Sequence, residues 1–245
     1  GFADLIVGAS KADSKGTLKA TGSTYVIFGG TQLGAIADFM GDASDNTLSG
    51  VTTTNASEFF VGGLGHDTII GNGGADLMYG GAGNDIFVIN ASNITALQSA
   101  YNAGGNTDKL SRIDGGGGLD TLQLANASNL DLTQVANQGG GTVDKQSRLE
   151  SIEIIDMATS TAANTLTLSV VDVNDLGQFN LFNAGNTVLV SGTDLATAVN
   201  QHQLLVKAGT ADTVKLIGSD AYADSGTVVT YDSANYKVYT STSKN

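Results

Sequence analysis

Residues 62–88 read GGLGHDTII, GNGGADLMY and GGAGNDIFV when they are written in rows of nine. Every row begins with glycine, carries an aspartate at its sixth position and places an apolar residue two positions after that aspartate. The aspartates are Asp67, Asp76 and Asp85, and the apolar residues are Ile69, Met78 and Phe87. Another row, GGGGLDTLQ, covers residues 115–123, and a weaker one, TTNASEFFV, covers residues 53–61 with Glu58 at the acidic position. Such a fixed period indicates a repeated structural unit.

The rows resemble G-G-x-G-x-D-x-U-x, the RTX or haemolysin-type calcium-binding repeat. This resemblance implies a parallel β-roll in which each row forms half a turn, so that alternate rows stack on the same side. The residue types agree with it, because the tight turn needs backbone conformations that a Cβ would forbid. The three residues after the turn would form a short strand whose central apolar side chain points inward. We therefore expect an all-β fold, with a parallel β-roll fused to a β-rich domain.

Two stacked turns of this kind would form an oxygen cage for Ca²⁺, which prefers carbonyl and carboxylate oxygens at about 2.3–2.6 Å. The resemblance implies one site made by Gly63, Gly65, Asp67, Gly80, Ala82 and Asp85. On the opposite side of the roll, Gly71, Gly73 and Asp76 would face Thr54, Ala56 and Glu58. This second cage departs from the family pattern. The alternative pairs Asn72, Gly74 and Asp76 with Gly115, Gly117 and Asp120, if the intervening insert loops out.

The composition limits the classes of function. The 245 residues include 33 glycines and no cysteine, which excludes disulfides, cysteine-based zinc sites and thiol catalysis. Of the 24 acidic residues three are Glu and 21 are Asp, a short carboxylate that suits turns and hard cations. A net charge of −13 makes the chain a poor partner for nucleic acid or an anionic membrane. No apolar run reaches the ~20 residues that cross a bilayer, so we expect no membrane insertion.

Residues 1–37 differ from the repeats. The stretches DLIVGA and GSTYVIFGG predict two short strands at Asp4–Val7 and Thr24–Phe28. Together they resemble one FG-GAP repeat of integrin-type β-propellers. One repeat cannot close a propeller, so we expect either the tail of a truncated propeller or strands recruited by the next domain. The sequence begins inside this motif, without Met or a visible signal peptide, which favours a fragment of a longer protein.

The rest of the chain divides into an insert and a β-rich region. The insert, near residues 90–113, has apolar residues at helical spacing and predicts a short helix with Ser92 or Asn93 as N-cap. Its Asp108 and Asp114 are either further ligands or turn carboxylates. We expect three domains: an FG-GAP-like segment (1–37), the roll with its insert (38–124) and a β-rich C-terminal domain (125–245).

Segments such as RIDGGGGLDTLQL, RLESIEIIDM and NTLTLSVVDV resemble the C-terminal region of very large type I-secreted bacterial adhesins. In that family, FG-GAP-like segments, RTX units and a β domain occur in this order. The resemblance implies an extracellular or cell-surface protein of a Gram-negative bacterium. It also implies calcium-dependent folding after secretion, and a role in surface attachment or biofilm formation.

Catalytic signatures are absent from the sequence. The chain has no H-E-x-x-H, no G-x-S-x-G and no G-x-x-x-x-G-K, and its only histidines are His66 and His202. Carboxylate pairs such as Glu150 with Glu153 are more common as surface charges than as glycosidase acids. We therefore expect a chain that is not an enzyme. Two alternatives stay open: a calcium-dependent domain that binds a peptide or glycan, and an accessory RTX module of a secreted hydrolase.

Overall fold

The computed structural model describes residues 5–9, 23–27, 37–107, 109–125, 127–136, 147–183, 201–218 and 222–241. The chain divides into two compact units, Gly1–Ile36 and Ala37–Asn245. In the first unit, β1 (Leu5–Ala9) and β2 (Ser23–Ile27) form an antiparallel pair in which Leu5 lies opposite Ile27. The FG-GAP resemblance and the three domain boundaries stay predictions.

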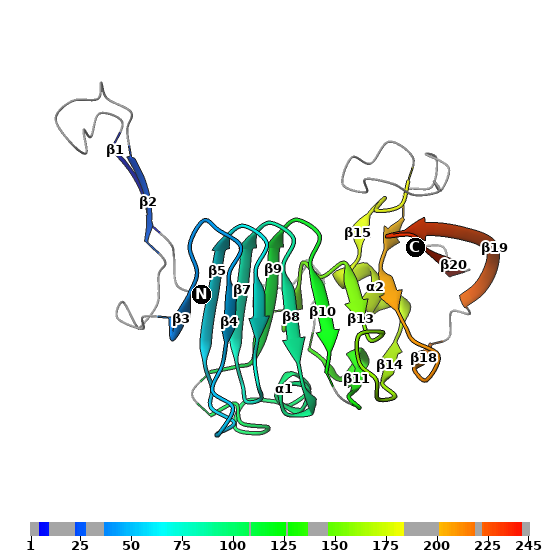
Figure 1. Cartoon of the computed structure of the whole chain (residues 1–245), viewed down its shortest axis with the longest axis horizontal. Coiled ribbons are helices and arrows are strands. Elements are labelled where there is room, and N and C mark those ends of the chain that lie inside the picture. The colour runs from blue at the N-terminus through cyan, green and yellow to red at the C-terminus, as the bar shows by residue number, and fades with distance from the viewer. Residues whose placement is uncertain are drawn as a thin grey trace. The chain divides into compact units, whose positions relative to one another are not determined.

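Two parallel sheets form most of the second unit (Figure 1). The first sheet contains β3 (Phe39–Met40), β5 (Phe59–Leu64), β7 (Leu77–Ala82), β9 (Arg112–Gly117) and β12 (Leu149–Glu150). The second contains β4 (Thr47–Ser49), β6 (Thr68–Ile70), β8 (Ile86–Ile89), β10 (Thr121–Leu124), β13 (Ile154–Asp156) and β17 (Leu205–Lys207). The chain alternates between the sheets, as a parallel β-roll requires. The predicted all-β fold is confirmed.

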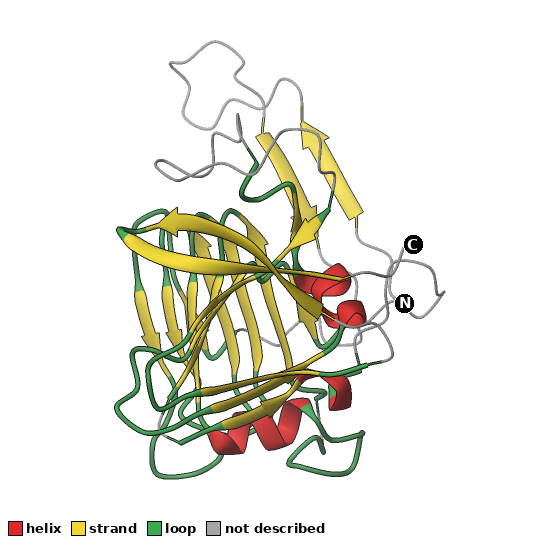
Figure 2. Cartoon of the chain, turned by 90° about the vertical axis from the view of Figure 1, so that its right-hand side faces the viewer, coloured by secondary structure: helices red, strands yellow, loops and turns green. Residues whose placement is uncertain are grey.

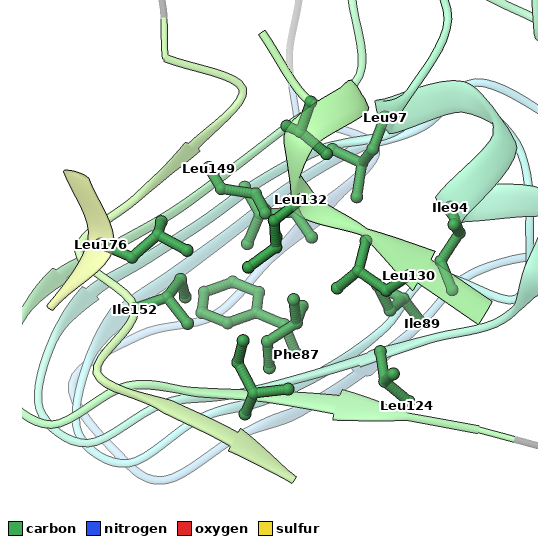
Figure 3. Packing of buried hydrophobic residues seen from close by; sticks show 14 of the residues in the cluster. Phe87, Ile89, Ile94, Leu97, Leu124, Leu130, Leu132, Leu149, Ile152 and Leu176 are labelled. Atoms are coloured by element: carbon green, nitrogen blue, oxygen red, sulfur yellow. The ribbon is translucent and has the colours of Figure 1, made fainter. Parts of the chain in front are cut away.

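The register of the sheets follows the sequence period. Phe60 lies beside Met78 in the first sheet, and Ile69 lies beside Phe87 in the second, so that alternate rows stack. These apolar side chains point between the sheets and are 0–1% exposed. Figure 3 shows how Phe87 packs within this core, together with apolar residues from later coils and from the helices. The inward residue of each row therefore builds one continuous core.

The parallel stacking continues beyond residue 125. A third sheet contains β11 (Asn129–Asp131), β14 (Thr165–Leu168) and β18 (Thr213–Leu216), all parallel. A 3-10 helix, η1 (Leu132–Gln134), follows β11, and helix α2 (Val170–Leu176) follows β14. Because β13 pairs with β10, the coils after residue 125 extend the sheets of the roll.

The insert forms helix α1 (Ala91–Leu97). Its N-cap is Asn90, whose side chain accepts hydrogen bonds from the N–H groups of Ser92 and Asn93. The prediction of Ser92 or Asn93 as N-cap was therefore wrong by two or three residues; Asn93 instead completes the capping box from inside the helix. Leu97 is buried in the core, whereas Tyr101 lies beyond the helix and is 56% exposed.

The C-terminal part of the chain also contains two antiparallel pairs. Strand β15 (Gln178–Phe179) pairs with β16 (His202–Gln203), and β19 (Tyr222–Tyr231) pairs with β20 (Ala234–Ser241). Figure 2 shows β19 and β20 as long, curved strands. Among the described residues no helix is long and apolar enough to span a bilayer.

Candidate metal centre

The turns that lead from the first sheet to the second stack into a column, which we call the first edge. It consists of residues 41–46, 62–67, 80–85, 115–120 and 151–153. The stacking is in register, because Gly63 lies beside Gly81 and Gly81 lies beside Gly116. The acidic residue that ends each glycine-rich turn therefore lies beside its counterpart in the next coil.

A ladder of hydrogen bonds connects these acidic residues. The backbone N–H of Asp67 donates to Oδ1 of Asp85 at 2.8 Å, and the N–H of Asp85 donates to Oδ1 of Asp120 at 2.8 Å. The ladder begins with the N–H of Asn46, which donates to Oδ1 of Asp67, and ends with Oε2 of Glu153, which accepts from the N–H of Asp120 at 2.9 Å. One oxygen of each carboxylate is thus committed to holding the preceding turn.

The second oxygen of these aspartates has no donor. Oδ2 of Asp67, Asp85 and Asp120 is buried without a hydrogen-bond partner, and all three residues are at most 1% exposed. Leaving a buried carboxylate oxygen without a donor or a cation is energetically costly. A cation bound beside any of these three oxygens would therefore stabilise the folded chain.

Backbone carbonyls converge on the same three positions. A Cβ added to Gly62 would lie less than 3.0 Å from Oδ2 of Asp67 and from the carbonyl oxygen of Gly80. Equivalent clashes at Gly80 involve Asp85 and Gly115, and those at Gly115 involve Asp120 and Ser151. Each pocket of oxygens thus exists because the first residue of the turn is glycine.

Glycine is also needed inside the turns. Gly63 and Gly65 have φ values of +114° and +106°, in the region that side chains rarely adopt. A Cβ at Gly81 would collide with the carbonyl oxygen of Gly63, and one at Gly83 with that of Gly65. The close stacking of the turns therefore depends on the glycines that set the sequence period.

The electrostatics of the first edge favour a bound cation. Burial raises the pKa of Asp85, and burial together with the charge of Glu153 raises the pKa of Asp120 to about 7. The described part of the chain contains no group of three or more His, Asp or Glu side chains that could hold a metal by themselves. Most donors would therefore be carbonyl oxygens, a set that suits a hard cation such as Ca²⁺.

Comparison with protein-family models identifies the repeat. The model described as the RTX calcium-binding nonapeptide repeat matches residues 52–87, in four copies. These residues are RTX calcium-binding repeats. The row at 115–123 lies outside the match, although its turn continues the first edge of the RTX roll. No curated protein and no solved structure matches the chain.

The first predicted site is brought together by the RTX roll. Its residues lie in two stacked turns of the first edge, where β5 and β7 pair: Gly63, Gly65, Asp67, Gly80, Ala82 and Asp85. The carbonyl of Ala82 accepts from the N–H of Gly65 at 2.9 Å, while the carbonyl oxygen of Gly80 and the free oxygen of Asp67 both lie within 2.5 Å of the place that a Cβ on Gly62 would take. In this RTX turn one carbonyl thus holds the preceding turn, and another lies close to the carboxylate oxygen that has no donor.

The other predicted pairings give mixed outcomes. Turn 71–76 stacks on residues 50–58, because the N–H of Glu58 donates to Oδ1 of Asp76 at 2.9 Å. The alternative, which paired Asn72, Gly74 and Asp76 with Gly115, Gly117 and Asp120, is wrong. Gly116 and Gly117 lie beside Gly81 and Ala82, on the first edge. The insert leaves the roll and rejoins it on the side opposite the first edge. Turn 115–120 therefore stays in the first edge, stacked on turn 80–85.

The opposite column, which we call the second edge, consists of residues 50–58, 71–76 and 90–93. It differs from the first edge in how its carboxylates are satisfied. Both oxygens of Glu58 accept from the N–H of Val51, at 3.0 and 3.2 Å. Oδ2 of Asp76 accepts from the side-chain amide of Asn93 at 2.8 Å. Neither carboxylate has the buried, unpartnered oxygen that marks the first edge.

Sequence reasoning missed the contribution of Ser151 and Glu153 to the first edge. The signal was present, because Glu153 precedes the inward-pointing Ile155 by two residues, as Asp120 precedes Leu122. Without the glycines of the RTX pattern, this spacing alone did not identify a coil.

Asp114 forms an ion pair with Arg112 at 3.0 Å, and Asp108 lies outside the described residues.

Proposed function

We propose that this chain is a calcium-binding module of an extracellular RTX adhesin, and that calcium binding after secretion drives the folding of its roll. The observation that carries the calcium part is the row of three buried carboxylate oxygens without donors, each beside a carbonyl of the next turn. In the bound state Ca²⁺ neutralises these carboxylates and satisfies the carbonyls. The residues of the chain supply the oxygens and hold them in register.

The balance of forces explains why folding would depend on the ion. Each nine-residue row buries one large apolar side chain, and its glycines lose much conformational entropy on folding. Without metal, the carboxylates of the first edge stack as like charges in a chain whose net charge is −13. Because the complete site exists only in the folded roll, the binding energy of calcium becomes folding energy.

The test compares the metal-stripped chain with the chain in millimolar calcium. We expect calcium to raise the β-sheet signal in circular dichroism and, at about 100 times its Kd, to raise the melting temperature by roughly 5–10 °C. Isothermal titration calorimetry measures the number of ions bound. If the spectrum and the melting temperature are the same in chelator and in calcium, the proposal is wrong.

The adhesin part rests on the order of segments in the sequence and on the lack of catalytic signatures. In the structure, Nδ1 of His202 lies 2.8 Å from the carbonyl oxygen of Gly177, and its ring lies against Phe179. These contacts hold an exposed imidazole against the β15–β16 pair. We expect the purified chain to show no protease, lipase or glycosidase turnover. Turnover that disappears in a folded His202→Ala variant would contradict the non-enzyme proposal.

A second candidate function is the binding of a peptide or glycan. A cavity of about 840 Å³ lies between the ends of the sheets and the β19–β20 hairpin, and Phe182, His202 and Tyr236 are among its lining residues. The lining also includes Tyr222, whose hydroxyl is buried without a hydrogen-bond partner. Peptide and glycan arrays probed with the chain, with and without calcium, test this function. Loss of a captured ligand in Tyr222→Phe would place it in the cavity, and no binding across the arrays would remove this candidate.

A further inference from the structure

Helix α1 closes the second edge with a side-chain amide. Nδ2 of Asn93 donates to Oδ2 of Asp76 at 2.8 Å and to the carbonyl of Gly74 at 3.3 Å. Asn93 is 1% exposed, and Asp76 is fully buried. The nitrogen therefore makes the contacts with one carboxylate and one turn carbonyl that an ion would make at this place.

The two edges can be compared at equivalent glycines. On the first edge, a Cβ at Gly62 would meet the free oxygen of Asp67 and a carbonyl oxygen. On the second edge, a Cβ at Gly71 would lie closest to the methyl group of Met78, and would meet Oδ2 of Asp76 and Nδ2 of Asn93 at 2.9 Å each. The place beside the aspartate that a carbonyl oxygen takes on the first edge is thus taken by a hydrogen-bond donor at Asp76.

The orientation of the Asn93 amide is fixed by its other contacts. Its Oδ1 accepts from the N–H of Gly73 at 3.0 Å and from the N–H of Asn90 at 3.2 Å. Since the oxygen has two donors, the nitrogen must face Asp76. The guanidinium of Arg148 holds the other end of α1, donating to the carbonyls of Ala96 at 2.8 Å and Ser99 at 3.0 Å.

The column of turns between the second and third sheets uses an amide in a similar way. Oδ1 of Asn164 accepts from the N–H of Ser128 at 2.8 Å, as the aspartates of the first edge accept from the preceding coil. Its Nδ2 donates to the carbonyl of Ala162 at 3.1 Å. An amide thus holds the preceding turn and satisfies a turn carbonyl without an ion.

We propose that the Asn93 amide takes the place of a calcium ion on the second edge, so that Asp76 binds no metal and α1 closes this edge without one. The positions beside Asp67, Asp85 and Asp120 on the first edge stay open to calcium, because no amide reaches their free oxygens. This inference rests on the proposed calcium binding, and it assigns α1 a function that the nonapeptide pattern does not contain.

The test changes the charge at the two positions in the full chain. Asn93→Asp places a second carboxylate beside Asp76, so we expect a lower melting temperature in chelator and one additional calcium ion bound by calorimetry. The double variant Asp76→Asn/Asn93→Asp exchanges amide and carboxylate. It should recover stability in chelator and bind the same number of ions as the wild type.

Asp76→Asn and Asp85→Asn form the matched pair. We expect Asp76→Asn to keep the calcium stoichiometry of the wild type and Asp85→Asn to lower it. If Asp76→Asn loses an ion, the Asn93 proposal is wrong while the calcium function stands. If the wild type binds no calcium, the proposed function fails as well. Asn93→Ala keeps the test decisive where Asn93→Asp does not fold, because a normal melting temperature of this variant in chelator would also overturn the proposal.

Discussion

The backbone nitrogen of Asp85 lies 2.8 Å from a carboxylate oxygen of Asp120, although 35 residues separate them. The corresponding bond between Asp67 and Asp85 spans 18 residues and has the same length. The additional residues form α1 and its connections on the opposite side of the roll. The first edge therefore keeps its geometry across an insertion, because the insertion enters and leaves at the second edge.

Removal of one first-edge carboxylate should weaken calcium binding. We expect Asp85→Asn to lower calcium affinity by at least about tenfold, because the site loses a charged ligand. Asp224→Asn is the control, since Asp224 lies on the exposed hairpin and pairs with Lys237. Calorimetry should show normal calcium binding for the control. If both variants bind calcium with equal affinity, Asp85 is not a ligand of the site.

Closing one oxygen pocket with a methyl group should have a similar effect. In Gly80→Ala the Cβ would meet Oδ2 of Asp85 and the carbonyl of Gly115, whereas in Gly117→Ala it would meet nothing within 4 Å. Neither glycine has a positive φ, so the comparison isolates the space that the methyl group occupies. We expect Gly80→Ala to lose calcium-dependent stabilisation of about 1–3 kcal/mol or more and Gly117→Ala to retain it. Calcium titrations followed by thermal unfolding distinguish the two.

The stability of the metal-free roll should depend on pH. Burial raises the pKa of Asp120 and of Asp76 from an ordinary value of 3.8 to about 7. Between these values the folded chain binds more protons than the unfolded chain, so stability decreases as pH rises. We expect the melting temperature of the metal-stripped chain to increase by roughly 4–8 °C from pH 8 to pH 6. If the metal-stripped chain is equally stable at pH 8 and pH 6, the pKa values of Asp76 and Asp120 are not raised.

Calcium binding should have the opposite pH dependence and become weaker as the pH is lowered. Protons and calcium compete for the Asp120 carboxylate, so calcium affinity should fall as the pH is lowered through its pKa of about 7. The measurement is a set of calorimetric titrations between pH 8 and pH 6. Proton release on binding, seen as a dependence of the observed enthalpy on the buffer, provides an independent check. No change in affinity over this range would indicate that Asp120 is ionised before calcium binds.

The core should tolerate truncation poorly at its centre. Phe87 is fully buried between Ile69 and Leu122, its neighbours on β6 and β10. We expect Phe87→Ala to lower the free energy of unfolding in calcium by about 3–5 kcal/mol. Met40→Ala is the control, because Met40 is 65% exposed. Chemical denaturation at saturating calcium measures the free energy of unfolding of both variants. Similar decreases in the two variants would show that the inward residues do not hold the roll together.

The sequence predicts the roll well because its signal is local. Glycine positions, the aspartate and one inward apolar residue recur within nine residues, so the stacking of residues 62–88 follows from the period. The placement of turn 115–120 could not be predicted this way. Because the insert can have any length, the sequence does not show at which edge of the roll the next glycine-rich turn lies. The pairing of β7 with β9 places that turn on the first edge.

The contacts of Asn93 and Glu153 were beyond prediction for a different reason. Asn93 lies in a helix whose sequence indicates only an N-cap, and its partner Asp76 is 17 residues away on another coil. Glu153 reaches Asp120 across 33 residues without a glycine-rich turn. Both contacts depend on packing between distant segments, and a single sequence carries little information about such packing.

The carboxylate ladder of the first edge runs in one direction. Asn46, Asp67, Asp85 and Asp120 each donate a backbone N–H to the acidic residue of the following coil. Each of these four N–H groups therefore has its acceptor on residues that the ribosome adds later. A nascent chain that ends before Glu153 lacks the carboxylate acceptor for the N–H of Asp120, so this ladder has a polarity. Assembly from the C-terminal coil toward the N-terminal one supplies each of these N–H groups with its carboxylate at once, whereas growth in the order of synthesis leaves the last one waiting for the next coil.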